Sequence, residues 1–292
     1  MDILIVVIYR NTHRCANWIC CGLKKVGDRS ARPFIRWAGS KKKLLPELKA
    51  NMPADYNRYI EPFCGSACLF FELSPERALL SDINQELINA YRVLRDRSDI
   101  YKKLLSLPVT KDFYYQMRRK NPARMSEYNR AVRFLYLNRY CFNGIYRTNQ
   151  KGEFNVPMGN RTGSFPSEEE YLKIVDSLSG VELLVGDYAL ALESAKKDDF
   201  VYMDPPYAEG GKFTGEYGRG SFDGGRLNEL YGGLDKLDKK GVKFLFSYRC
   251  SEGVIRSLED RYHVVELDVK RHISGFKTGW DTVKEIMVKN YA

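Results

Sequence analysis

The chain has 292 residues, and its 47 lysines and arginines exceed its 37 aspartates and glutamates, which leaves a net charge of +10. Apolar residues make up 44% of the sequence and aromatic residues 13%, enough for a large core, so a disordered chain is excluded. The longest aliphatic run, residues 3–8, is far short of the roughly 20 residues that cross a bilayer, which excludes a membrane protein. This run follows Asp2 rather than a basic segment, so a secretory signal is disfavoured.

The N-terminal segment, residues 1–32, is expected to be an extension of unknown role. It holds the one cluster of metal-ligand residue types in the sequence, which consists of His13, Cys15, Cys20 and Cys21. A structural zinc site usually has a second, separate pair of ligands, which is missing here, so we expect no metal. The seven cysteines are odd in number and irregular in spacing, which favours reduced thiols over a disulfide framework.

After this segment, short apolar stretches alternate with helical patterns. The predicted helices are 86–95, 127–138, 168–178 and 226–239, and the predicted strands are 59–61, 78–81, 181–185, 200–203, 243–247, 263–270 and 283–289. Strands separated by helices predict a largely parallel sheet with helices on both faces. The last two strands have no helix between them and predict an antiparallel edge. The helix-rich, basic residues 90–180 interrupt the alternation, so we expect an inserted domain there and a sheet domain from 33–89 and 181–292.

The first motif leaves the first predicted strand as Glu61-Pro62-Phe63-Cys64-Gly65. A glycine in such a turn lets the backbone approach a nucleotide-like ligand closely. Asp82 ends the second predicted strand 17 residues later, where a carboxylate can accept hydrogen bonds from ribose hydroxyls. The alternative is that Asp82 caps the following helix.

The second feature is a basic segment, residues 118–161, in which ten lysines or arginines face two glutamates and give a charge of +8. Aromatic residues are interleaved with the charges, which is typical either of a nucleic-acid surface or of a solvated face around an aromatic core. Residues 145–148 and 153–157 flank a turn and predict a β-hairpin, an element that fits the major groove. We expect Arg147 to reach a guanine edge, and Arg133 and Lys151 to contact phosphate.

The third motif, Asp204-Pro205-Pro206-Tyr207, follows an apolar strand, so its carboxylate is expected at the edge of the sheet where ligands bind. The prolines remove two N–H donors and leave carbonyl groups that can only accept. Asp204 and the Pro205 carbonyl could accept both protons of an amino group on a base and localise its lone pair for attack. Tyr207 would stack on an extruded base. The alternative, a plain turn after a buried strand, explains this combination less well.

Together these motifs resemble the α-group of the Dam-type (D12 class) DNA adenine-N6 methyltransferases. The resemblance covers roughly residues 33–291 and rests on the segments 34–41, 61–65, 134–140, 152–157, 204–207 and 213–217. It implies a Rossmann-like methyltransferase sheet that binds S-adenosylmethionine, mostly parallel with an antiparallel edge, and an inserted DNA-recognition domain made of helices and a β-hairpin.

The resemblance also assigns roles to residues. Trp37 and Lys41 would contact S-adenosylmethionine, with Lys41 paired to its carboxylate, and Asp187 would lie beside its adenine. The full set expected to line the cofactor site is Trp37, Lys41, Glu61, Phe63, Gly65, Asp82, Asp187 and Asp204. The catalytic set, which would grip a flipped adenine, is Asp204, Pro205, Pro206 and Tyr207. The set expected to contact DNA is Arg133, Asn138, Asn143, Arg147, Lys151 and Arg161.

Two positions depart from the family pattern. Ala67 stands where the family usually has the second glycine of the turn, so its Cβ could weaken cofactor binding if the position needs a positive φ. The family often has a basic residue directly after Pro-x-Gly, where this sequence has Asn160 and only then Arg161.

The function expected is methyl transfer from S-adenosylmethionine to adenine N6 in duplex DNA, with GATC as the first site to test. The alternatives are a cytosine-N4 methyltransferase, an RNA adenine methylase and a catalytically silent, sequence-specific DNA-binding protein. We expect a cytoplasmic monomer, bacterial or phage-encoded, that binds double-stranded DNA and no membrane. Its methylation would protect DNA from a separate restriction endonuclease, mark DNA alone, or serve a phage.

Overall fold

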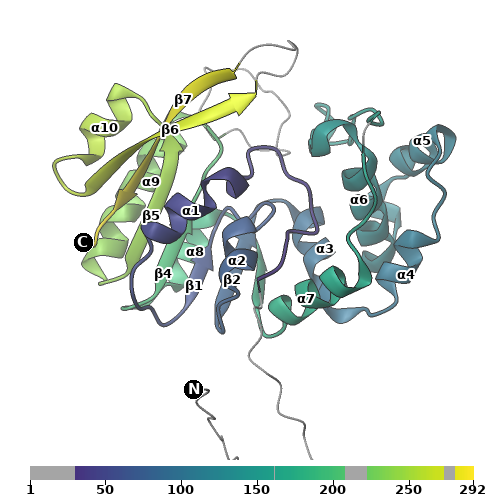
Figure 1. Ribbon diagram of the computed structural model, residues 1–292, viewed down its shortest axis with the longest axis horizontal. Coiled ribbons are helices and arrows are strands. Elements are labelled where there is room, and N and C mark those ends of the chain that lie inside the picture. The colour runs from purple at the N-terminus through teal and green to yellow at the C-terminus, as the bar shows by residue number, and fades with distance from the viewer. Residues whose placement is uncertain (1–29, 161, 208–221, 273–279) are drawn as a thin grey trace, which may run out of the picture.

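The computed structural model describes residues 30–160, 162–207, 222–272 and 280–292. The strands in this part of the chain form one seven-stranded sheet in the order β3-β2-β1-β4-β5-β7-β6 (Figure 1). Four neighbouring pairs of strands are parallel, and β7 runs antiparallel to both β5 and β6, which confirms the predicted antiparallel edge. The strands are β1 (Tyr59–Glu61), β2 (Ala78–Asp82), β3 (Glu182–Val185), β4 (Phe200–Met203), β5 (Lys243–Arg249), β6 (His263–His272) and β7 (Trp280–Lys289).

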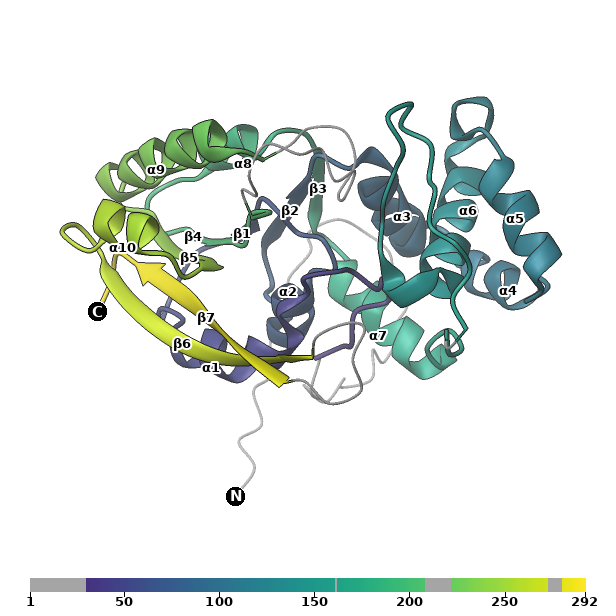
Figure 2. The same cartoon turned by 90° about the horizontal axis from the view of Figure 1, so that it is seen from above.

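The sheet has a hydrophobic core on each face because side chains alternate along every strand. In β4, Phe200 and Tyr202 enter one core, and Val201 and Met203 enter the other. One face is covered by α8 (Tyr188–Ser194), α9 (Gly224–Lys239) and α10 (Glu252–Leu258), and α1 (Leu45–Ala50) and α2 (Cys68–Leu73) cover the opposite face (Figure 2). The uniformly apolar sequence of β4 is therefore typical of a parallel strand that is buried on both faces.

The helices between β2 and β3 form a body beside the sheet, on the right in Figure 1. They are α3 (Gln85–Asp96), α4 (Ile100–Leu105), α5 (Lys111–Arg119), α6 (Glu127–Tyr140) and α7 (Glu168–Leu178). α6 packs on α3, and the core of this body is continuous with one face of the sheet. An insertion that starts at residue 90 would begin inside α3.

The predicted hairpin after α6 lacks its two strands. It is closed by one bridge, Thr148 to Phe154, and by the bonds from Asn149 N to Glu153 O (2.9 Å) and from Asn155 N to Arg147 O (3.1 Å). Before the bridge, Tyr146 stacks on Trp37, with ring centroids 5.8 Å apart and planes at 18°. The expectation of a regular ribbon was therefore wrong, although the turn itself is present.

Before α1, the chain crosses from the sheet to the helical body. The buried Asn138 of α6 holds both backbone groups of Arg36: its Oδ1 accepts from Arg36 N (2.9 Å), and its Nδ2 donates to Arg36 O (2.6 Å). Arg139 donates to the carbonyl of Phe34 (2.8 Å), and the Arg36 guanidinium donates to the carbonyl of Arg139 (2.8 Å). We call the paired Asn138–Arg36 bonds the Asn138 clasp. The clasp fixes the segment that continues into Trp37 and Lys41.

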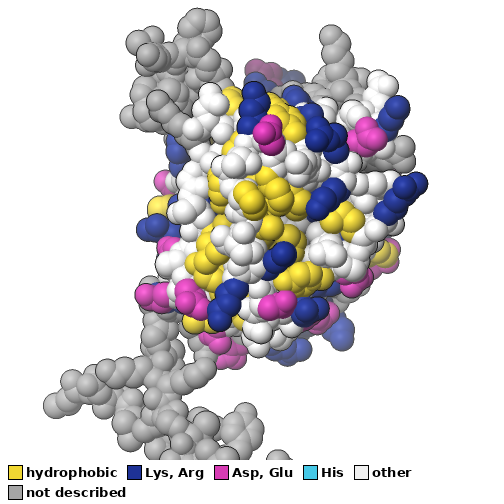
Figure 3. Space-filling view, turned by 90° about the vertical axis from the view of Figure 1, so that its right-hand side faces the viewer, with side chains coloured by type: hydrophobic (Ala, Val, Ile, Leu, Met, Phe, Trp, Pro, Cys, Tyr) yellow, Lys and Arg dark blue, Asp and Glu magenta, His cyan; other side chains and the backbone are white. Residues whose placement is uncertain are grey.

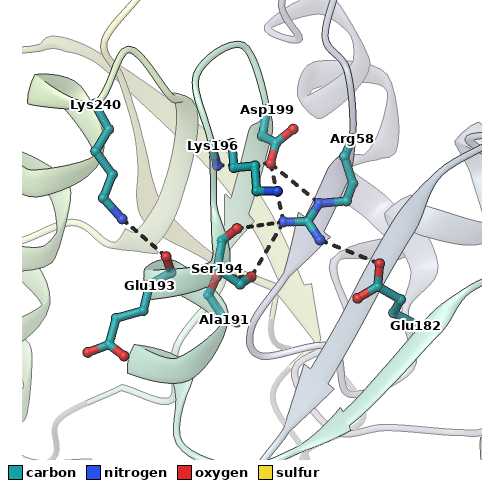
Figure 4. Close-up of polar contacts among 8 residues, drawn as sticks. All are labelled: Arg58, Glu182, Ala191, Glu193, Ser194, Lys196, Asp199 and Lys240. Carbon is teal, nitrogen blue, oxygen red and sulfur yellow. Dashed lines mark hydrogen bonds and ion pairs between the residues drawn. The ribbon is translucent and has the colours of Figure 1, made fainter.

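Arg58 lies at the amino-terminal ends of the strands and connects three of them by polar contacts (Figure 4). Its guanidinium lies 3.3 Å from the Asp199 carboxylate and 3.5 Å from that of Glu182, and it donates to the Ser194 carbonyl (2.8 Å). Arg58 precedes β1, Asp199 precedes β4 and Glu182 opens β3. This cluster fixes the register of the sheet far from its carboxyl edge.

Within the described ranges, no helix is both long and apolar enough to cross a bilayer. In the same ranges, Cys64, Cys68, Cys141 and Cys250 are free thiols, and no group of side chains is arranged to hold a metal. The N-terminal histidine and cysteine cluster, Arg161 and the 213–217 motif all lie outside the described residues.

Candidate active site

A cavity of about 380 Å³ opens at the carboxyl ends of β1, β2 and β4, where ligands bind in open α/β sheets. Its volume lies within the range typical of small-molecule sites. The cavity brings together every residue predicted for the cofactor and catalytic sets. These residues are Trp37, Lys41, Glu61, Phe63, Gly65, Asp82, Asp187, Asp204, Pro205, Pro206 and Tyr207.

The turn after β1 lies against the indole of Trp37. Gly65 has φ +46°, and a Cβ at this position would lie 2.7 Å from Cδ1 of Trp37, so no side chain fits. Its carbonyl accepts a bond from the hydroxyl of buried Tyr91 (2.8 Å). Ala67 has φ +50°, which matches the positive φ considered from the sequence and places an L-residue in a region that favours glycine.

Asp82 joins the ends of β1 and β2. Its carboxylate accepts from the backbone N–H of Gly65 (3.1 Å) and of Asn84 (2.9 Å). The cap of α3 is Asn84, which accepts from Glu86 N and Leu87 N, so the helix-cap alternative for Asp82 was wrong. Burial raises the pKa of Asp82 to about 6, against the opposing effect of these backbone bonds.

Glu61, the last residue of β1, forms a buried acidic wall of the cavity. Its Oε2 accepts from the Tyr59 hydroxyl (2.8 Å). Burial, reinforced by nearby Asp204, raises its pKa to about 8 despite the bond from Tyr59. Glu61 is therefore protonated at neutral pH in the structure as it stands.

Asp204, directly after β4, meets the ammonium group of Lys41. Lys41 Nζ lies 2.7 Å from Asp204 Oδ1, donates to the Tyr207 hydroxyl (3.0 Å) and lies 3.6 Å from Glu285 Oε2. Burial alone would lower the pKa of Lys41, but Asp204, Tyr207 and Glu285 outweigh it and raise the pKa, so the lysine stays charged. Burial raises the pKa of Asp204, and Lys41 opposes this.

The far side of the cavity is built from α8 and α9. Asp187 caps α8 by accepting from Ala189 N (3.0 Å) and forms an ion pair with Arg226. Arg226 in turn lies over the ring of Tyr188, 4.9 Å from its centroid. Phe222 packs edge-on against Phe63, so aromatic rings and one ion pair enclose this side.

The residues predicted to contact DNA fall into two groups. Asn143, at φ +53°, and Lys151 are exposed, and Arg147 is half-buried, with its Nε bonded to Asn155 (2.9 Å). Arg133 and Asn138 are buried. Figure 3 faces the outer side of the helical body, where basic side chains surround apolar patches and many acidic ones lie near the lower edge.

Both buried residues bond to backbone groups. Arg133 donates to the carbonyls of Met117 (3.0 Å) and Arg118 (2.9 Å) at the end of α5, and Asn138 forms the clasp with Arg36. Their contact with DNA stays a prediction, and the structure gives each of them a packing role.

Sequence reasoning missed Phe222 and Arg226, which line the cavity, and Glu285, a buried neighbour of Lys41. A signal existed for Glu285. It lies in a strand whose next three residues are apolar, a pattern typical of a strand buried on both faces. An acidic residue in such a strand needs a buried partner.

Comparisons of the sequence with known proteins match it to DNA methyltransferases. A family model described as "D12 class N6 adenine-specific DNA methyltransferase" matches residues 37–273. The chain is 34% identical over 276 residues to the Type II methyltransferase M1.LlaDCHI of Lactococcus lactis subsp. cremoris, covering 89% of this chain and 95% of that protein. It is 36% identical over 182 residues to the DNA adenine methylase of Escherichia coli (strain K12), covering 61% and 65% respectively.

Solved structures align at lower similarity. The C-terminal domain of precorrin-6Y C5,15-methyltransferase from Rhodobacter capsulatus covers 90% of this chain and 98% of that one, with 12% identity and a TM-score of 0.42. Precorrin 8w decarboxylase of Methanobacterium thermoautotrophicum gives 13% identity and a TM-score of 0.39, covering 91% and 98%. The sheet order and strand directions, rather than these scores, define the fold.

Proposed function

Because the chain belongs to the D12 class N6 adenine-specific DNA methyltransferase family, we propose that this DNA adenine methyltransferase modifies the adenine of GATC in duplex DNA after turning that base out of the helix. The proposal rests above all on one observation: Asp204 and Tyr207 line a cavity, beside a buried lysine, at the edge of the sheet. A base stacked inside a duplex cannot enter a cavity, so a target that reacts there must leave the stack.

The catalytic motif suits an exocyclic amine. Asp204 and the Pro205 carbonyl accept the two amino protons, which draws the nitrogen lone pair out of the ring and toward the methyl donor. The Tyr207 ring is held edge-on by Tyr248 (centroids 5.2 Å apart) and by the bond from Lys41 to its hydroxyl. A fixed ring of this kind is a stacking surface for an extruded adenine.

The cavity also fits S-adenosylmethionine, the methyl donor that the family implies. When bound, this molecule supplies an electrophilic methyl group on a positively charged sulfur. Asp82 would accept from the ribose hydroxyls, and the side formed by Phe63, Asp187 and Phe222 would enclose the adenine ring. Asp82, with a pKa of about 6, is ionised at neutral pH, which suits a cationic ligand, and the close contact of Gly65 with Trp37 leaves the turn free of side-chain atoms.

Lys41 is proposed to act mainly on Asp204. An ammonium has three protons, and three protein oxygens lie around this one, on Asp204, Tyr207 and Glu285. A cofactor carboxylate that approached Lys41 would compete with these neighbours. Pairing of Lys41 with the cofactor therefore stays a prediction of the family resemblance.

DNA recognition is proposed for the exposed segment after α6. Asn143, Arg147 and Lys151 offer hydrogen-bond donors to base edges and phosphates. Phe142 is 48% exposed directly beside Asn143, and an exposed aromatic ring in this place can insert between base steps. The DNA would then lie next to Trp37, which Tyr146 of the same segment contacts.

One chain carries both the cavity and the segment proposed to contact DNA, which supports the proposal of a monomer. We propose that it acts on DNA in the cytoplasm. Relatives named as Type II methyltransferases support a role beside a restriction endonuclease that acts separately.

The test uses tritiated S-adenosylmethionine and 20-base-pair duplexes that contain GATC or one altered base of it. We expect label in N6-methyladenine, recovered after digestion to nucleosides, from the GATC duplex and none with Asp204→Ala. Label in N4-methylcytosine would refute adenine as the target, and equal labelling of the altered duplexes would refute GATC.

Base flipping is tested separately with 2-aminopurine in place of the target adenine. Its fluorescence should rise several-fold when the protein binds, because unstacking removes quenching, and should stay low for a probe placed outside the site. Tight binding without that rise would refute flipping.

A further inference from the structure

Glu285 is a buried acidic residue that the catalytic motif does not include. It lies on β7, paired with Arg249 of β5 on one side and Leu267 of β6 on the other. Its side chain is only 2% exposed. Removing a carboxylate from water is costly unless charged or hydrogen-bonding partners compensate, so the partners of Glu285 explain its presence.

Those partners belong to the proposed catalytic machinery. Oε2 of Glu285 lies 3.6 Å from Lys41 Nζ, and Oε1 accepts a hydrogen bond from the Tyr207 hydroxyl (3.3 Å). The same hydroxyl accepts from Lys41, whose ammonium pairs with Asp204. Glu285 therefore closes a ring of polar contacts that includes both functional side chains of the Asp204–Tyr207 motif.

The charges in this ring are unequal. Asp204 and Glu285 are carboxylates and Lys41 is the single cation among them, so the group has a net charge of −1 when all three are ionised. The amine that receives a methyl group carries a positive charge until it releases a proton. A fixed excess of negative charge beside that nitrogen favours the charged state over the neutral one, and preorganised charge of this kind is effective in a water-excluded site.

We propose that Glu285 is a positioning residue for methyl transfer, which holds Lys41 and Tyr207 so that Asp204 faces the target amine and the surrounding charge stays negative. The inference rests on the proposed function of the Asp204–Tyr207 motif. In this arrangement, Lys41 is shared between two carboxylates instead of neutralising Asp204 alone. Glu285 acts through its neighbours and touches no reacting atom.

The experiment compares Glu285→Gln with Glu266→Gln in the full-length protein. Glu266 lies on the neighbouring strand β6 and is about half exposed, so it controls for the same chemical change without burial. The measurements are the single-turnover rate on the duplex labelled by wild type, the Kd for S-adenosylhomocysteine, the Kd for the duplex and the thermal midpoint.

We expect Glu285→Gln to slow methyl transfer by roughly 10- to 100-fold, less than loss of a direct transition-state contact, with both Kd values within about threefold of wild type. Glu266→Gln should match wild type throughout. Weakened binding with an unchanged rate, or a rate loss that only follows loss of folded protein, would overturn the inference. If Glu285→Gln does not fold, Glu285→Asp takes its place: it keeps the charge but shortens the reach, so an unchanged rate would overturn the inference.

A double variant tests the route through Tyr207. Glu285→Gln combined with Tyr207→Phe should lose less activity than the product of the two single losses, because glutamine weakens the hydrogen bond that phenylalanine removes. Multiplicative losses would refute that route. If wild type labels no adenine in any duplex, the proposed function fails and the role of Glu285 falls with it, whereas an active wild type with an equally active Glu285→Gln refutes Glu285 alone.

Discussion

The Asn138 clasp makes a sharp prediction about stability. Replacing Asn138 with alanine removes two short bonds and leaves the N–H and C=O of Arg36 without their protein partners. Each lost bond is worth about 1 kcal/mol net, and each group left unpaired costs about 1–3 kcal/mol when water cannot reach it. Because Arg36 is half-buried, water relieves part of this cost, and we expect a total loss of roughly 2–4 kcal/mol in the free energy of unfolding.

The assay is urea unfolding, followed by tryptophan fluorescence and by circular dichroism, together with the Kd for GATC duplex. Asn129→Ala, an exposed change on the same helix, should alter stability by less than about 0.5 kcal/mol. Asn138→Asp keeps the acceptor for Arg36 N but sets a carboxylate against the Arg36 carbonyl, so it should destabilise at least as much as alanine.

The reasoning is refuted by one pattern in particular. If Asn138→Ala leaves the unfolding midpoint unchanged and weakens DNA binding by tenfold or more, Asn138 contacts DNA directly and the clasp contributes little. If stability falls and DNA binding of the folded protein is retained, the packing role holds.

Four further predictions follow from the same structure. Ala67→Gly should stabilise the protein by about 1 kcal/mol in urea unfolding, because a positive φ is strained for alanine; a loss of stability would contradict this. Gly65→Ala should weaken S-adenosylhomocysteine binding at least tenfold by calorimetry, because its Cβ would displace Trp37; unchanged affinity would show that the indole moves freely. Arg58→Ala should cost about 2–4 kcal/mol of stability, since it leaves buried Asp199 without its charged partner, while single-turnover rates at low temperature stay near wild type. The pKa of Asp82 is raised to about 6, so cofactor affinity should fall as pH decreases below 6 and the carboxylate is protonated, and Asp82→Asn should remove that step from the pH profile.

The Asp82 carboxyl also affects folding. Its folded pKa lies above the usual value, so between about pH 4 and pH 6 the native state binds more protons than the unfolded chain. The contribution of Asp82 to stability therefore falls as pH rises through this window. The proposed contact of Asp82 with the ribose would therefore come at the expense of stability.

The sheet could be predicted from the sequence because its signals are local. The run Phe200–Met203 is uniformly apolar between polar residues, and both its ends match β4. Residues 168–178 carry an acidic first turn after Ser167, and that serine forms a capping box with Glu170. Such signals depend on residues within one element, so tertiary contacts do not alter them.

The rest could not be predicted because it depends on distant partners. Arg133 has the residue type and local charge of a phosphate contact, but its donors are used by carbonyls of α5. Asn138 bonds to a residue 102 positions away. The role of Glu285 requires β7 to lie between β5 and β6, an order that strand patterns alone do not specify.

The clasp also bears on how a protein of this kind changes its target sequence. The helical body, the proposed DNA-recognition unit, lies between β2 and β3 and could be exchanged by recombination at its two chain junctions. A third contact between the helical body and the rest of the chain exists here. Residues 34–36 precede the insertion in the sequence, and yet they form hydrogen bonds with α6. A helical body taken from another protein would pack against residues 34–36 of this chain, which are not complementary to it. Poor packing there would displace Trp37 and Lys41, which follow directly in the sequence. New specificity is thus expected to arise by point substitution among the exposed residues after α6, and successful chimaeras should inherit residues 34–36 and the helical body from the same parent.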